Sequence, residues 1–220
     1  MTPLEYSQRD AAVDAVRRLD ALGMNRGSTG NLSLRWNHDG QDGMLITPTG
    51  MGAEDLRAQD MVWVGADGSH RGDWQPSSEW HFHRAVYGAR PDLHAVVHTH
   101  STHAAALACL RRPLPAFHYM VAVAGGDDVP LTPYHLFGTE ALSQAVAQAL
   151  RERNACLMAN HGLVAAGRSL AQAMKVAQEI ESLCEVYLKA LVVGEPALLS
   201  REEMAVVIER FGHYGKTARA

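Results

Sequence analysis

The sequence predicts a β-sheet covered by helices, of the α/β or the α+β class. Segments with helical and strand-like patterns alternate along 220 residues, a length that suits one domain. Hydrophobic residues make up 47% of the chain and charged residues 20%, as in globular proteins. Ser or Thr also stands at the expected start of most helices, where its side chain can cap the backbone.

The first helix is predicted from a start signal, a periodic apolar face and a stop. Thr2 precedes Pro3, apolar residues recur at helical spacing from Ala12 to Leu22, and Gly23 follows. The further helices are expected to start at Ser77 or Ser78 (to about Arg90), at Ser101 (towards Leu110), at Thr139 (to about Arg151), at Ser169 and at Ser200.

The strands are predicted from alternation or from short apolar runs. Leu32, Leu34 and Trp36 alternate with polar residues, as in a strand with one buried face. Runs that are apolar throughout predict buried strands at 44–46, 61–64, 95–97 and 155–159. These patterns do not determine the strand order.

The composition argues against several classes of protein. No apolar run approaches the roughly 18 residues that a membrane span needs, and residues 1–16 lack the basic-then-apolar order of a secretory leader. With 20 basic and 24 acidic residues, the net charge of −4 does not favour binding to nucleic acid. Cys109, Cys156 and Cys184 lie far apart in apolar stretches, which predicts reduced core thiols in a cytoplasmic protein.

Histidine is unusually frequent, with 12 His against 4 Phe, and this suggests a metal site. His98 and His100 follow an apolar strand, and residues two apart on a strand point to the same face. His161 lies in an Asn-His-Gly turn after another apolar strand. Three neutral imidazoles with an open fourth position are typical of a catalytic zinc site.

Glu79 is the natural fourth group of such a site. It lies at the predicted start of a helix, where an acidic residue is also common for electrostatic reasons alone. His103 and His83 are competing candidates, because His103 is close to the His98/His100 pair and His83 is one helical turn from Glu79.

Three loops combine glycine with hydroxyl side chains, as oxyanion sites do. They are 28–31 (STGN), 47–50 (TPTG) and the Ser77–Ser78 pair. Each alone is also ordinary turn or cap chemistry. The third directly precedes Glu79, so it would hold a phosphorylated substrate with its reacting carbons over the metal.

Taken together, these segments resemble the class II aldolase/adducin-head family over nearly the whole chain. The matching segments are 30–33 (GNLS), 43–50 (GMLITPTG), 76–80 (PSSEW), 95–100 (AVVHTH), 118–120 (HYM), 124–126 (AGG), 137–139 (FGT) and 161–163 (HGL). The resemblance implies an α/β fold, a three-layer α/β/α sandwich with a central mixed sheet, formed by residues 1–220 as one domain. It also implies a homotetramer with active sites between subunits.

The resemblance further implies roles for individual residues. Zinc would be held by His98, His100 and His161, with Glu79 as a ligand and as the acid/base on the substrate carbon. Tyr119 would act on the aldehyde oxygen at the site of a neighbouring subunit. The remaining assignments are phosphate binding by Gly30, Asn31, Thr49, Gly50, Ser77 and Ser78, and shaping of the aldehyde end by Phe137, Phe211 and Tyr214.

The activity implied is zinc-dependent cleavage of a 1-phosphoketose, such as L-fuculose 1-phosphate, to dihydroxyacetone phosphate and an aldehyde. No Schiff-base lysine is required, and the chain has only three lysines, all towards its C-terminal end. His135 departs from the expected pattern at the aldehyde end, so the aldehyde stays open. The alternatives are aldolases for 5-deoxyribulose or methylthioribulose 1-phosphate, a ribulose-phosphate 4-epimerase, decarboxylase chemistry, and a non-catalytic adducin-like binding module.

Overall fold

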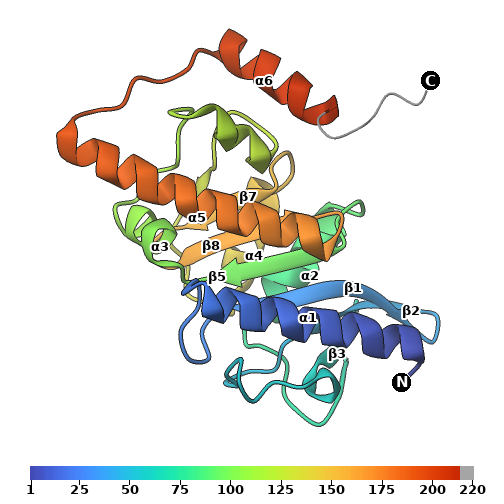
Figure 1. Ribbon diagram of the computed structural model, residues 1–220. Coiled ribbons are helices and arrows are strands. Elements are labelled where there is room, and N and C mark those ends of the chain that lie inside the picture. The colour runs from blue at the N-terminus through green and yellow to red at the C-terminus, as the bar shows by residue number, and fades with distance from the viewer. Residues whose placement is uncertain (214–220) are drawn as a thin grey trace.

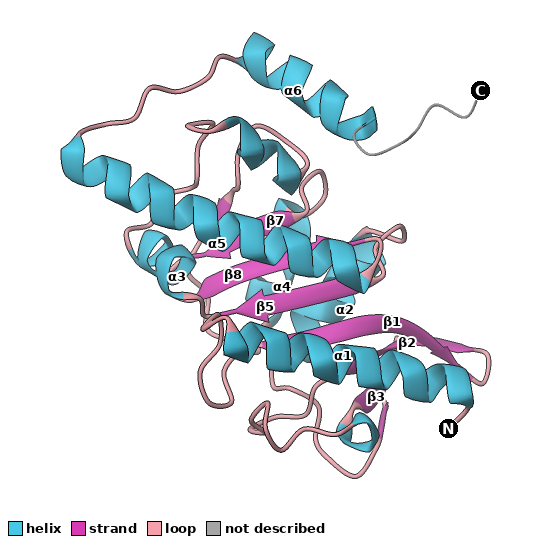
Figure 2. Ribbon diagram, in the orientation of Figure 1, coloured by secondary structure: helices cyan, strands magenta, loops and turns pink. Residues whose placement is uncertain are grey.

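The computed structural model describes residues 1–213, which form one eight-stranded sheet between two layers of helices (Figures 1 and 2). The strand order is β4-β3-β2-β1-β5-β8-β7-β6. The strands are β1 (Asn31–His38), β2 (Gln41–Ile46), β3 (Val62–Gly65), β4 (His70–Arg71), β5 (Ala95–Thr99), β6 (Leu131–Thr132), β7 (Ala155–Met158) and β8 (Gly162–Gly167).

The helices cover both faces of this sheet. They are α1 (Pro3–Ala21), α2 (Trp80–Ala89), α3 (Thr102–Cys109), α4 (Glu140–Ala149), α5 (Leu170–Val193) and α6 (Arg201–His213), with two 3-10 helices, η1 (Ala58–Asp60) and η2 (Tyr119–Ala124). Helices α1, α3 and α5 pack on one face, and α2 and α4 on the other (Figure 1). Alternate strand residues therefore enter separate cores, as Val97 and Val96 of β5 do.

The sheet is mixed. Strands β6 and β7 are parallel, whereas the other paired strands run antiparallel. The architecture is thus the three-layer α/β/α sandwich with a mixed sheet, and the predicted α/β class is confirmed. None of the helices in the described part of the chain combines the length and the apolar character needed to cross a bilayer.

The central strands determine where the site forms. Strand β5 is paired with β1 on one side and with β8 on the other, with Asn31 opposite His98 and Leu163 opposite Thr99. The start of β1, the end of β5 and the turn before β8 therefore meet at the same end of these central strands. The predicted metal ligands Glu79, His98, His100 and His161 lie at this end of the strands.

Most predicted helix starts are confirmed by their caps. The hydroxyls of Thr2, Thr139 and Ser169 each accept a hydrogen bond from the backbone N–H three residues later. Ser200 and Glu203 satisfy each other's backbone N–H groups reciprocally at the start of α6.

The start of α2 differs from the prediction. Its N-cap is Glu79 rather than Ser77 or Ser78. Ser77 instead accepts the N–H of Glu79 through Oγ (3.3 Å) and the N–H of Trp80 through its carbonyl (3.0 Å). Ser77 therefore stabilises the turn that precedes α2, and Glu79 lies at the N-terminus of this helix.

Three further expectations need correction. Strand β5 ends at Thr99, so His100 lies one residue beyond it. Cys109 is exposed rather than part of the core, although all three cysteines are free thiols and Cys156 and Cys184 are buried as predicted. Strand β8 was not predicted, because the buried segment GLVAAG consists largely of glycine and alanine, which are uncommon in strands.

Candidate active site and metal centre

A cluster of four possible metal ligands lies at the strand ends where β1, β5 and β8 come together. Its members are Glu79, His98, His100 and His161. One ligand atom from each lies within 4.8 Å of the others. Glu79 Oε2 is 3.3 Å from His98 Nε2, and Glu79 Oε1 is 3.3 Å from His161 Nε2. The Nε2 atoms of His98 and His100 are 2.9 Å apart. The predicted pairing of His98 with His100 is thus confirmed, although His100 lies beyond the strand.

A glycine allows His161 to approach this cluster. A Cβ at Gly162 would lie 2.4 Å from the carbonyl oxygen of Thr99 and 3.3 Å from the His98 ring. The turn before Gly162 contains Asn160, a non-glycine residue with positive φ (56°). The short β7–β8 connection therefore brings His161 against the end of β5 only because residue 162 has no side chain.

The buried hydrogen bond of His98 determines its tautomer. His98 Nδ1 is 2.9 Å from the carbonyl oxygen of Leu163, which can only accept. Nδ1 therefore carries a proton, and Nε2 is the ring nitrogen that faces Glu79 and His100. A ring held by a backbone carbonyl in this way is typical of a histidine that binds metal.

The charges within the cluster also suit a cation. Burial acts to raise the pKa of Glu79, but His98 and His161 outweigh burial and hold this pKa well below its usual range. Burial, followed by the charge of His98, lowers the pKa of His100 and of His161 to about 4 each. Near pH 7 the cluster therefore offers the carboxylate of Glu79 and the neutral imidazoles of His100 and His161.

An unsatisfied oxygen supports a metal ligand set. Glu79 is 8% exposed, and its Oε1 atom is buried without a hydrogen bond among the described residues. A buried carboxylate oxygen without such a partner is costly unless a cation neutralises it. Nitrogen and carboxylate donors of this kind are ligands that zinc prefers.

The two competing histidines lie outside the cluster. The ring of His103 is 2.9 Å from a carboxylate oxygen of Glu181, which also accepts backbone N–H groups at the start of α3. His83 is fully buried beneath the site and contacts Asn31 and Ser33. Burial, followed by the charge of His98, lowers the pKa of His83 to about 3.

The predicted phosphate loops lie next to this cluster and are tied together. Pro48 and Pro76 form a β-bridge, and Ser77 N donates to the carbonyl of Thr47 at 3.0 Å. Gly30 has φ 73° and packs against the side chain of Asn25, which accepts the N–H of His100 at 3.2 Å. The loop that carries Gly30 is therefore anchored to the metal-ligand segment itself.

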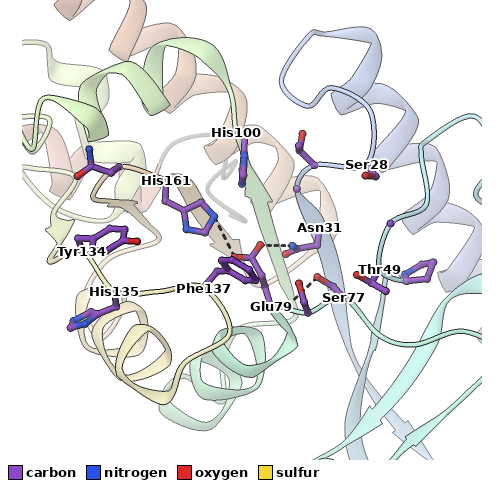
Figure 3. Close-up of a pocket in the computed structure, with 16 residues that line it drawn as sticks. Ser28, Asn31, Thr49, Ser77, Glu79, His100, Tyr134, His135, Phe137 and His161 are labelled. Carbon is purple, nitrogen blue, oxygen red and sulfur yellow. Dashed lines mark hydrogen bonds and ion pairs between the residues drawn. The ribbon is translucent and has the colours of Figure 1, made fainter.

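A cavity of about 350 Å³ joins the cluster and the loops (Figure 3). Ser28, Thr49 and Ser77 lie on one side of it, and Tyr134 and His135 on the other, with Glu79 between them. All six predicted phosphate residues line this cavity: Gly30, Asn31, Thr49, Gly50, Ser77 and Ser78. Neither of the described lysines, Lys175 and Lys189, lines it.

The residues predicted for the aldehyde end are dispersed. Phe137 lines the cavity and is 60% exposed. Tyr119, 50% exposed on η2, lines a different depression together with Phe211 of α6. Tyr214 lies outside the described residues. The role of Tyr119 at a neighbouring subunit's site and that of Phe211 at the aldehyde end stay predictions.

Sequence reasoning did not select Tyr134 or Asn160 as site residues, yet both line the cavity. Tyr134 lies in an irregular segment before α4, where no periodic pattern indicates which way a side chain points. Asn160 directly precedes His161, so its place in the turn was the one available signal.

Comparison with known proteins agrees with this geometry. The model of the Class II Aldolase and Adducin N-terminal domain family matches residues 10–188. The chain belongs to this family. Class II aldolases are metal-dependent, and among the described residues Glu79 with its three histidines forms a group that suits a metal.

Three relatives illustrate the likeness within the class II aldolase family. The chain is 48% identical to the 5-methylthioribulose-1-phosphate/5-deoxyribulose-1-phosphate aldolase of Rhodospirillum rubrum, over 96% of this chain and 94% of that one. It is 46% identical to the L-fuculose phosphate aldolase of Escherichia coli K12, over 92% and 93%. A solved L-fuculose 1-phosphate aldolase superposes with a TM-score of 0.88 at 38% identity, covering 93% of this chain and 95% of its own.

Proposed function

We propose that the protein is a zinc-dependent aldolase that cleaves a 1-phosphoketose of the L-fuculose 1-phosphate type to dihydroxyacetone phosphate and an aldehyde. One observation carries the proposal. A single cavity is lined by Glu79, His100 and His161 and by three loops of glycine and hydroxyl residues. A phosphorylated substrate held by the loops would have its reacting carbons beside the cluster.

The metal in this proposal is zinc, which would be held by His98, His100 and His161, with Glu79 as the fourth ligand while no substrate is bound. The direction of His98 Nε2 into the cluster and the unsatisfied oxygen of Glu79 support this ligand set. Bound zinc would act as a Lewis acid that stabilises the negative charge developing on the substrate oxygens.

The phosphate would be bound by hydroxyl groups and backbone N–H groups. Thr49, Ser77 and Ser78 offer hydroxyls along the cavity wall, and Gly30 and Gly50 allow the backbone to approach an anion closely. Such a grip fixes the distance between the phosphate and the reacting carbons. Binding of the phosphate would therefore also hold the reacting carbons of the substrate next to Glu79.

Glu79 would exchange the carbon proton. In the condensation direction its carboxylate takes a proton from the carbon next to the ketone of dihydroxyacetone phosphate, and in cleavage the proton returns there. The low pKa of Glu79 keeps the carboxylate ionised. Tyr119 would exchange a proton with the aldehyde oxygen from a neighbouring subunit.

Cleavage of 5-methylthioribulose or 5-deoxyribulose 1-phosphate is the second candidate. The Rhodospirillum rubrum relative with that name is 48% identical, close to the 46% of the E. coli fuculose enzyme. Both candidates use the same phosphoketose half and differ in the aldehyde. Phe137, Tyr134 and His135 are therefore the residues proposed to decide between them.

We further propose that residues 1–220 form one domain, that the active unit is a homotetramer with sites between subunits, and that the protein is cytoplasmic. The single continuous sheet supports one domain. Tyr119 lines a depression other than the cavity of Glu79, and this supports a site that a neighbouring subunit completes. The free thiols suit a reducing compartment.

A cleavage screen tests the proposal. Zinc-loaded protein is incubated with fuculose, rhamnulose, 5-deoxyribulose and methylthioribulose 1-phosphates, and the release of dihydroxyacetone phosphate is measured, with Glu79→Gln as the inactive control. We expect release from at least one substrate, which also identifies the aldehyde. If zinc is bound but none of the four substrates releases dihydroxyacetone phosphate, the aldolase proposal is contradicted and epimerase or decarboxylase chemistry is favoured. Failure to bind zinc would favour a non-catalytic, adducin-like role.

A further inference from the structure

A row of buried polar side chains runs behind the active site without lining its cavity. It consists of Ser33, His83 and Tyr87, which are 0%, 0% and 6% exposed. The row reaches the site through Asn31, whose Nδ2 donates to Glu79 Oε2 at 2.9 Å. Buried polar groups this close to a reactive carboxylate require an explanation.

Two regular elements interlock to build this row. Asn31 and Ser33 lie two apart on β1 and share a face, while Glu79, His83 and Tyr87 recur every four residues along α2. Asn31 Oδ1 is 2.5 Å from His83 Nε2, and Ser33 Oγ is 2.7 Å from His83 Nδ1. Tyr87 OH lies 2.9 Å from Ser33 Oγ.

Hydrogen-bond chemistry gives this row one direction. The ionised carboxylate of Glu79 can only accept, so the amide nitrogen of Asn31 must face it and the amide oxygen must face His83. His83 Nε2 must then carry the proton, and Nδ1 must accept the proton of Ser33. The donors of Ser33, His83 and Asn31 therefore all point towards Glu79.

We propose that His83 is a positioning residue of the active site, whose Nε2–H fixes the Asn31 amide with its nitrogen towards Glu79 and the cavity. This inference rests on the proposed function, because it assigns Glu79 and Asn31 to the reaction. A flipped Asn31 amide would direct its oxygen at the carboxylate of Glu79, where two acceptors repel each other. His83 and Ser33 prevent this flip.

The position of His83 separates it from the metal ligands one turn away. Its two ring nitrogens are both occupied, one by Asn31 and one by Ser33, so neither lone pair faces the cluster. Its ring also stacks on Phe82, with the centroids 4.6 Å apart. The imidazole is therefore held in one place and one tautomer from both sides.

Two substitutions of matched polarity test this role. In His83→Gln the side-chain amide nitrogen can replace Nε2–H and still donate to Asn31. In His83→Asn the shorter amide can contact Ser33 but does not reach Asn31. A loss of about 10-fold or more in kcat/KM is expected for His83→Asn. His83→Gln is expected to restore activity to within about twofold, the usual error of such comparisons.

A double-mutant cycle shows whether His83 acts through Asn31. The cycle combines His83→Asn with Asn31→Ala, and it is measured both by kcat/KM and by zinc affinity in competition with a chelator. We expect His83→Asn to weaken zinc binding in the wild-type background and to change it by less than about twofold when Asn31 is already Ala. A merely structural role would produce the same loss in both backgrounds.

The two readouts separate this inference from the proposed function. If the wild-type protein cleaves no phosphoketose but the zinc-affinity cycle shows coupling, the positioning role stands and the aldolase assignment falls. If cleavage occurs while the effects of His83 and Asn31 are additive, or while His83→Gln is as impaired as His83→Asn, the positioning role is overturned. Thermal midpoints of each variant identify losses that come from unfolding alone.

Discussion

The metal half of the site and the aldehyde half are built in opposite ways. The metal half (Glu79, His98, His100 and His161) converges within one chain, and His98 is fully buried against the carbonyl of Leu163. The proposed aldehyde half (Phe137, Tyr119 and Phe211) is divided between two depressions, and Phe137 and Tyr119 are 60% and 50% exposed. The proposed metal centre is thus fixed by the sheet, whereas the residues proposed to recognise the aldehyde lie outside the sheet in two separate places.

The largest effect is expected from breaking the metal half. His98→Ala removes the buried ligand at the centre of the cluster, so zinc content should fall to near zero and turnover by more than about 100-fold. Metal analysis of the purified variant provides the measurement. His103→Ala is the matched control, because His103 contacts Glu181 and not the cluster. Full zinc content in His98→Ala would show that the ligand set is wrong.

Glu79→Gln should separate metal binding from proton transfer. The three imidazoles remain, so zinc is expected to stay bound, whereas kcat should fall by about 10² to 10⁴ because the amide cannot accept a proton. Steady-state kinetics with metal analysis check this. Glu152→Gln, at an exposed position, controls for the loss of one charge. Normal turnover in Glu79→Gln would remove Glu79 from the mechanism.

Tyr119→Phe probes the aldehyde half and should have a smaller effect. If Tyr119 serves a neighbouring subunit, losing its hydroxyl should slow cleavage by about 10²-fold and leave KM, which reflects phosphate binding, nearly unchanged. The kcat and KM of Tyr119→Phe are compared with those of Tyr6→Phe, another exposed tyrosine. A variant with normal kinetics and a lower melting temperature would give Tyr119 a purely structural role.

The smallest effect concerns stability and pH. In the metal-free protein the pKa values of His100 and His161 are lowered to about 4, below the ordinary 6.5, by burial and the charge of His98. The unfolded chain therefore binds more protons between these values, so stability is complete above pH 6.5 and falls as the pH drops towards 4. Urea midpoints of the metal-free protein across this range should decrease. A midpoint that rises on acidification would contradict the lowered pKa values.

Local signals in the sequence predicted the fold where the determining interaction is itself local. The caps at Thr2, Thr139 and Ser200 depend on residues three positions away, and all three are confirmed. The prediction was wrong at Ser77 and Ser78, because the loop there is bound to the 47–50 loop and α2 begins later. Strand β8 was missed because four of its six residues are glycine or alanine, which are uncommon in strands.

The site could be predicted in its residues but not in its connections. His98, His100 and His161 were selected from strand and turn patterns, and they do converge. The four-residue spacing between Glu79 and His83 could not show whether His83 is a second metal ligand or a positioning residue. Both roles place the two side chains on the same face of the helix. Asn31 and Ser33 contact the two ring nitrogens of His83 only because α2 lies against β1 in the folded chain, and this long-range contact has no local signal in the sequence.

The close approach at Gly162 has a consequence for how the sequence can vary. Position 162 takes part in no chemistry, yet a single methyl group there would collide with the backbone of Thr99 and press on the His98 ring. In a saturation screen for activity, substitutions at Gly162 should therefore be rejected as strictly as those at the metal ligands. The least reactive residue in the chain is, in this respect, as constrained as the most reactive ones.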